Sequence, residues 1–149
     1  MIDAQLSLDA NVRVVAISPD GMTVDCVSNV TCVGGHEAVA ELLAGARPTV
    51  DSVALGNDGG AGTDTSNRSL NNQLDTVAAN SLDSSGATAT IRAFVPSLLQ
   101  LGSAADPVDE VGAVLSSGDL LNHATIPSVD LSGTDTVLVI DITITVADA

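Results

Sequence analysis

The residues of this chain that could do chemistry begin with two cysteines and a histidine. Cys26 and Cys32 lie in CVSNVTC, and His36 follows, which gives three metal-ligating types in the spacing C-x5-C-x3-H. Zinc sites typically use closer C-x2-4-C pairs and four ligands, so this spacing disfavours a metal. Two alternatives stay open for the cysteines. An oxidising compartment would join them in a hairpin disulfide, and a reducing one would leave two free buried thiols.

A loop rich in glycine and aspartate offers oxygen ligands for a cation. Residues 59–64 read GGAGTD, which matches one copy of a calcium-binding element that forms between stacked repeats. Asn57, Asp58 and Asp64 are the candidate ligands. Because the chain contains a single copy, a solvated Gly-Asp turn is favoured over a metal site, and we expect no metal and no cofactor.

Enzymatic motifs are missing from the sequence. It contains no G-x-S-x-G and no H-E-x-x-H, and it has no lysine for a Schiff base or a phosphate-binding loop. His123 follows Asn122 in a predicted strand, so we expect it to join a structural hydrogen-bond network rather than act as a general base. Glu110 directly precedes the apolar run VGAVL, and we expect a partly buried structural anchor. We therefore predict no catalytic residues and no enzyme.

Charge narrows the possible partners. The 149 residues carry 19 acidic side chains, 16 of them aspartate, against 4 arginines and no lysine, for a net charge of −15. This composition is typical of proteins in concentrated salt, where the Debye length is about 3 Å at ~1 M. An acidic protein of ordinary surroundings is the alternative. Clustered basic residues are missing and Phe94 is the one aromatic residue, so we expect no nucleic-acid partner.

Two further features concern targeting and modification. The sequence has no apolar run of about 18 residues, which predicts no membrane insertion. Its first fifteen residues show no basic stretch ahead of an apolar one, which predicts no secretory signal. Asn29 and Asn67 begin N-x-[ST] sequences, so glycosylation stays open at both.

The elements that must position these residues are mostly strands. Apolar residues alternate over Thr136–Val146, which predicts a long half-buried strand, and over Ala87–Val95, which Pro96 ends. Turn sequences rich in Gly, Ser, Asp and Pro separate further segments. These predicted strands are Arg13–Ile17, Met22–Val27, Val50–Leu55, Gly112–Leu115 and Leu120–Ile126.

One helix is predicted, over His36–Ala44, with Gly35 as its N-cap and Gly45 ending it. Gln100–Pro107 is predicted to be a loop. Short antiparallel strands at this spacing predict an all-β fold: an antiparallel β-sandwich or small barrel with one short accessory helix. We expect an N-terminal arm over residues 1–10 and a single sandwich domain over residues 11–149.

The order of short motifs between residues 50 and 146 resembles that of small virion proteins of tailed phages. The motifs are VALG at 53–56 before a Gly/Asp/Thr loop, LNNQL at 70–74, IRAFVP at 91–96, EVGAVL at 110–115 and GDLL at 118–121. This order is similar to that of tail-collar fibre N-terminal domains and related tail or head accessory proteins. The chain departs from the pattern at Gln73 and Asp109, and its residues 113–115 lack a phenylalanine.

Together with the salt-adapted composition, the resemblance implies a tailed virus of a halophilic, archaeal host. It implies a non-enzymatic structural subunit of the virion, assembled in the host cytoplasm. Tail, baseplate or fibre attachment is the first expectation and capsid decoration the alternative; an extracellular β-sandwich adhesion module is the second alternative. We expect a homo-oligomer, a trimer first, whose N-terminal arm contacts a neighbour and whose other partners are virion proteins.

Overall fold

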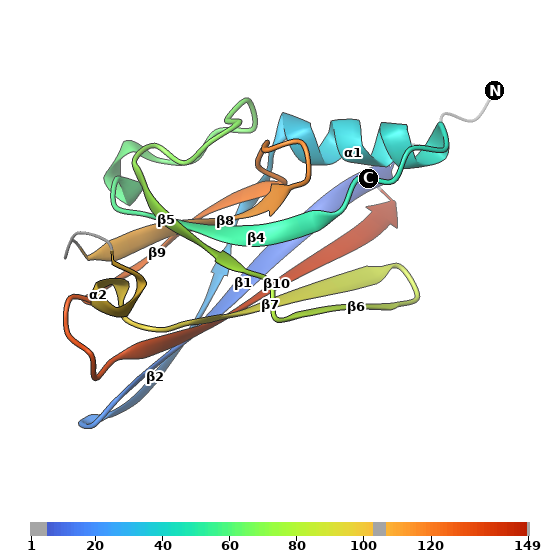
Figure 1. Cartoon of the computed structure of the whole chain (residues 1–149). Coiled ribbons are helices and arrows are strands. Elements are labelled where there is room, and N and C mark those ends of the chain that lie inside the picture. Colours follow the sequence, from blue (N-terminus) through green and yellow to red (C-terminus); the bar gives the residue numbers. More distant parts are fainter. Residues whose placement is uncertain (1–5, 103–106, 149) are drawn as a thin grey trace.

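In the computed structural model, which describes residues 6–102 and 107–148, two five-stranded antiparallel sheets pack face to face (Figure 1). The strands are β1 (Leu6–Ser18), β2 (Gly21–Ser28), β3 (Val30–Thr31), β4 (Val50–Gly56), β5 (Gln73–Ala78), β6 (Ser81–Ser85), β7 (Thr88–Val95), β8 (Val108–Leu115), β9 (Asn122–Val129) and β10 (Val137–Asp148). The helices are α1 (Val33–Leu43), the short α2 (Leu98–Leu101) and a 3-10 turn, η1 (Gly59–Ala61).

The first sheet has the strand order β2-β1-β10-β7-β6 and the second β3-β9-β8-β4-β5. Every pairing within them is antiparallel. The all-β prediction is therefore confirmed, and of its two forms the structure is the sandwich. The accessory helix, α1, lies at one end of the two layers (Figure 1).

The core lies between the sheets and follows the alternation seen in the sequence. On β10, Leu138, Ile140 and Ile142 are fully buried, while the intervening residues face outward. They pack with inward-facing residues of the second sheet such as Leu55 and Val111. Burying each such side chain contributes about 1.5–3 kcal/mol, so this face holds the layers together.

Three short strands, β3, β5 and β6, were not predicted. β6 has the sequence SLDSS, and all five of its residues are exposed, so no apolar alternation marks it. It is a strand because it pairs with β7 at the edge of the first sheet. Backbone pairing with the next strand across a two-residue turn, rather than its own side chains, therefore defines this element.

The predicted helix begins three residues earlier than expected. Its N-cap is Cys32, and Gly35, predicted to be the cap, lies buried inside the first turn. A Cβ atom on Gly35 would come within 2.7 Å of the Leu121 carbonyl oxygen, so the glycine lets the helix pack against the chain before β9. Gly45, with φ of +92°, follows the end of the helix as predicted.

Other predicted boundaries also differ, among them the strand predicted over Gly112–Leu115, which begins at Val108. Residues 6–10 of the expected arm form the first part of β1 and pair with residues 144–148 of β10, and Ala10 belongs to the core. Residues 1–5 lie outside the described residues. In the predicted loop, Gln100 and Leu101 belong to α2, which starts at Leu98, a fully buried residue whose N–H donates to the Leu131 carbonyl oxygen. Residues 103–106 lie outside the described part.

No helix in the described part of the chain is long and apolar enough to cross a membrane.

Candidate functional site

A buried acid and a buried histidine face each other across neighbouring strands of the second sheet. Glu110 lies on β8 and His123 on β9, and both side chains are fully buried. His123 Nε2 is 2.8 Å from Glu110 Oε2. Glu110 is paired with Thr125 and Val111 with Ala124, so His123 lies diagonally across from Glu110 on the same face of the sheet.

The Glu110 carboxylate accepts hydrogen bonds from the backbone as well. Its Oε1 accepts the N–H of Asn72 at 2.8 Å and of Asp58 at 3.4 Å. Its Oε2 accepts the N–H of Asn71 at 3.1 Å, beside the His123 nitrogen. Four donors therefore converge on two oxygens, and the carboxylate pins two loops to the sheet. Glu110 is thus more deeply buried than the partly buried anchor that the sequence predicted.

The second ring nitrogen of His123 is also satisfied. Its Nδ1 is 3.1 Å from Nδ2 of Asn67, which also donates to Oδ1 of Asn71. Since an amide nitrogen only donates, Nδ1 accepts and Nε2–H donates, which is the pattern of a neutral imidazole. Asn122 next to it uses Oδ1 to accept the N–H of Ala113 at 2.9 Å. This sealed network positions backbone and leaves no room for a substrate beside the acid–base pair.

Gly56 leaves the space that Glu110 occupies. A Cβ atom at this position would come within 2.6 Å of the Asn72 carbonyl oxygen and closer still to Glu110 Oε1. Gly56 ends the VALG motif, Asn71 and Asn72 belong to LNNQL, and Glu110 begins EVGAVL. Three motifs that lie far apart in the sequence therefore meet at one carboxylate.

The candidate cation ligands do not converge. The Asn57 amide oxygen accepts from the side chain of Asn72. Asp64 Oδ1 accepts both the N–H and the hydroxyl of Ser66 at 2.7 Å, and these hydrogen bonds hold the pKa of the Asp64 carboxyl below its usual value. Asp58 is exposed and takes part through its backbone. Within residues 6–102 and 107–148, no group of three His, Cys, Asp or Glu side chains could hold a metal ion. These residues build turns.

The two cysteines are free thiols in different surroundings. Cys26 is exposed on β2, and Cys32 is buried at the start of α1. Burial, together with the charge of Asp64, raises the pKa of the Cys32 thiol to about 11. His36 is exposed on α1. Of the alternatives left open by the sequence, the structure therefore contains free thiols, although only one of them is buried.

In neither glycosylation candidate is the side-chain amide both exposed and unbonded. Asn67 Nδ2 donates within the His123 network. The amide atoms of Asn29 are buried. A glycan on Asn67 would break two hydrogen bonds of the network, so the structure disfavours that modification.

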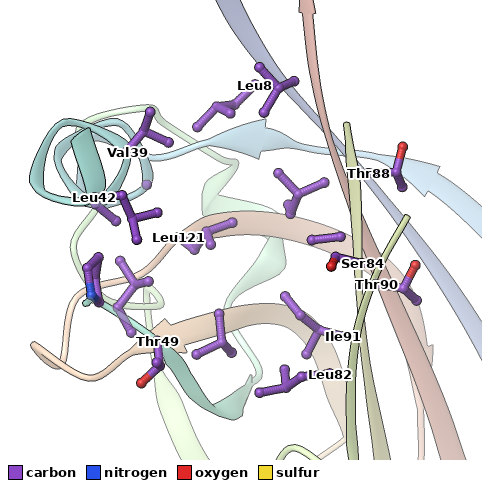
Figure 2. A pocket seen from close by; sticks show the side chains of 18 of the residues that line it. Leu8, Val39, Leu42, Thr49, Leu82, Ser84, Thr88, Thr90, Ile91 and Leu121 are labelled. Carbon is purple, nitrogen blue, oxygen red and sulfur yellow. The ribbon is translucent and has the colours of Figure 1, made fainter. Parts of the chain in front are cut away.

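An apolar pocket of about 410 Å³ opens at the end of the sandwich, between α1, the β6–β7 hairpin and the ends of both sheets. Figure 2 shows side chains of α1, both sheets and the hairpin surrounding it. Val39 and Leu42 come from α1, Leu82 from β6, and Ile91 from β7.

Thr88 and Thr90 are also among the lining residues, but they are paired with Thr145 and Thr143, so their hydroxyls point to the outer face of the first sheet. Asp83, the one acidic residue of the lining, is paired with Thr90 and points the same way. Pockets of this size and lining hold apolar groups.

The sequence missed this pocket, although one signal was present. Ala38, Val39, Leu42 and Leu43 form an apolar stripe on the predicted helix. Leu43 is 85% exposed and Leu42 54% exposed, so the stripe is only partly covered by the sandwich. The opposite wall of the pocket is formed in part by β6, a strand that the sequence does not predict because its residues show no alternation of apolar and polar side chains.

Comparison with protein-family models, curated proteins and solved structures finds no match for this chain.

Proposed function

We propose that this protein is a non-enzymatic structural subunit of a tailed virus particle from a halophilic host, placed in the tail, baseplate or fibre attachment. Capsid decoration is the alternative position. The proposal rests on the order of motifs, on the net charge of −15, and on one observation that carries it: an apolar pocket open at the end of a rigid sandwich. Such a pocket suits the anchoring of a neighbouring protein.

The convergence of three motifs on Glu110 supports this reading. The residues of the motifs that resemble virion proteins form one structural unit, since Gly56, Asn72 and Glu110 pack against one another. A motif pattern that builds a buried hydrogen-bond network is consistent with a structural protein. Copies of the subunit are proposed to associate, as a trimer first.

We propose that the pocket binds an apolar segment of another virion protein, and that basic residues flank the apolar side chain that enters it. Charge complementarity supports this occupant. Glu41 is exposed on α1, Asp83 lies at the rim on β6 with its side chain on the outer face of the sheet, and no lysine or arginine lines the pocket. At molar salt the charges are screened over about 3 Å, so the buried apolar side chain of the partner supplies most of the affinity. The basic residues beside it make the binding specific for this acidic surface.

The proposal is tested on purified particles separated into heads and tails and analysed by mass spectrometry. Presence in the tail fraction is expected, and presence in the head fraction alone would replace the tail position by capsid decoration. Absence from both fractions would overturn the proposal, and display on the cell surface instead would favour the adhesion module.

The pocket is tested with a matched pair of variants expressed during infection. Leu42→Glu places a charge on the pocket wall, while Leu43→Glu places the same charge on the next residue, which does not line the pocket. Incorporation of Leu42→Glu into particles should fall, and Leu43→Glu should incorporate like the parent protein. Equal incorporation of both variants would show that the pocket anchors nothing.

A further inference from the structure

The register of the first sheet aligns apolar side chains across its outer face. Val15 on β1 is paired with Val24 on β2 and with Val139 on β10, and Val139 is paired with Phe94 on β7. Directly paired residues of an antiparallel sheet point to the same face. These residues alternate with core residues such as Val14 and therefore point away from the core. They form a continuous apolar row across four strands.

A second apolar row lies beside the first, towards the β1–β2 turn. It contains Met22, Ile17 and Val137, which are also paired in register. Met22 is 65% exposed and Phe94 is 49% exposed. Four of the nine exposed large apolar side chains of the described residues lie in these two rows. Val15, in the middle of the first row, is only 6% exposed, so the exposed apolar surface lies on the four side chains around it, Met22, Ile17, Val24 and Phe94. Exposed apolar patches mark interaction sites.

The row on the other side is charged and contains two arginines around one carboxylate, for a net charge of +1. Asp141 is paired in register with Arg13 and Arg92. Arg92 donates to both oxygens of Asp141, at 2.7 and 3.0 Å, and Arg13 Nη1 is 3.6 Å from Oδ2. Two of the four arginines of the chain therefore surround the one carboxylate in these three rows. On a chain of net charge −15, these three rows contain no carboxylate other than the paired Asp141, whereas Asp83 and Asp9 lie further along the same outer face.

We propose that this outer face, the rows of Val15, Ile17 and Arg13, is an interface between two copies of the chain related by a two-fold axis. Copies of so acidic a protein repel one another wherever free aspartates meet. The three rows avoid that repulsion, and a two-fold axis places the same apolar rows of both copies in contact.

Charge also selects how the copies face each other. Strands running antiparallel across the interface bring the arginine row of one copy towards the β1–β2 turn of the other. That turn holds the exposed Asp20. The parallel arrangement would instead place arginine on arginine, so the antiparallel one is selected.

The size of the face fits a small contact between two copies. Its three rows, about six residues long at ~3.4 Å per residue, cross four strands at ~4.8 Å spacing and cover roughly 390 Å² in projection. A standard interface buries about 800 Å² of accessible surface per partner, so we expect a weak dimer. A two-fold contact gives assemblies with an even number of copies. By itself it gives a dimer, and if the copies also form trimers through another surface, it joins two trimers into a hexamer.

The mass of the protein in solution tests the inference. At ~1 M NaCl, where the Debye length is about 3 Å, light scattering and sedimentation equilibrium should give an even multiple of the chain mass. The double variant Val24→Asp/Phe94→Asp should raise the dimer dissociation constant by about 100-fold or more, since both side chains lie within the contact. The control Thr23→Asp/Leu43→Asp adds the same charge outside the face, because Thr23 is the neighbour of Val24 on the opposite face of β2. Its mass should remain that of the parent protein.

A second measurement uses the unmodified chain and does not depend on how the variants fold. Cys26 lies in the arginine row, in register with Arg13, and is exposed, while Cys32 is buried. The rate of maleimide addition to Cys26 should fall as protein concentration rises through the dissociation constant. A monomeric mass at every concentration, a constant Cys26 rate, or a dimer that survives the double variant would overturn the inference. Absence of the protein from virus particles would remove the proposed function and leave this inference intact.

Discussion

The Glu110 network makes a sharp prediction for the substitution Glu110→Gln. The carboxylate oxygens face four donors, three backbone N–H groups and His123 Nε2. Glutamine has the same shape but offers one acceptor oxygen, and its amide nitrogen must face two of the four donors. Each buried donor left without an acceptor costs about 1–3 kcal/mol. We therefore expect the free energy of unfolding to fall by about 4 kcal/mol, which corresponds to a melting temperature lower by roughly 10 °C.

The matched control is Asp109→Asn. Asp109 is the neighbouring residue, and its Oδ1 accepts one N–H, from Gly59 at 2.8 Å. Asparagine keeps an oxygen for that single donor, so a loss below about 1 kcal/mol is expected. Both substitutions remove one negative charge, which relieves repulsion, so general electrostatics predicts a small gain in stability for either variant. Only the hydrogen-bond geometry predicts a large loss for one of them.

Urea unfolding at constant salt measures both variants, with the slope of the transition checked for equality. If Glu110→Gln and Asp109→Asn were equally stable, the four donors would not depend on the Glu110 carboxylate. The hydrogen bonds of Glu110 would then not be what holds the two loops against the sheet.

Three further predictions concern pH, thiols and salt. The hydrogen bonds from Arg92 hold the pKa of Asp141 below its usual 3.8, so the pair stabilises the fold above that value and the contribution is lost as pH falls through the lowered pKa. Asp141→Asn should therefore be less stable by up to about 1 kcal/mol at neutral pH, and its thermal melts should approach those of the parent protein as the pH falls through the lowered pKa; a constant difference would contradict this. Maleimide should label Cys26 in the native protein and Cys32 only after unfolding, as mass spectrometry of peptides would show; native labelling of Cys32 would contradict its burial. Melting temperature and oligomer mass should both rise between ~0.1 M and ~3 M salt, and flat values would show that the acidic surface is no salt adaptation.

The long strands were predictable because their signal is local. The alternation of β10 is present in its own residues, and burial of one face follows from it. The helix was predictable for the same reason, apart from its first turn. Its start at Val33 depends on close packing of Gly34 and Gly35 against the chain before β9, which no local pattern reveals. The prediction of Glu110 as an anchor came from a charge beside an apolar run.

What only the tertiary structure decided is the set of partners. Asn72, which donates to Glu110, is 38 residues away in the sequence, and β6 is a strand only through its pairing with β7. The apolar row on the outer face exists because four strands are held in one register, and a shift by one residue would turn each of its members towards the core. Alternation along a strand is a property of neighbouring residues, whereas register and long-range hydrogen bonding depend on which distant segments pack together. The sequence of a chain can therefore predict its strands, whereas the surfaces that the strands form depend on how the sheets assemble.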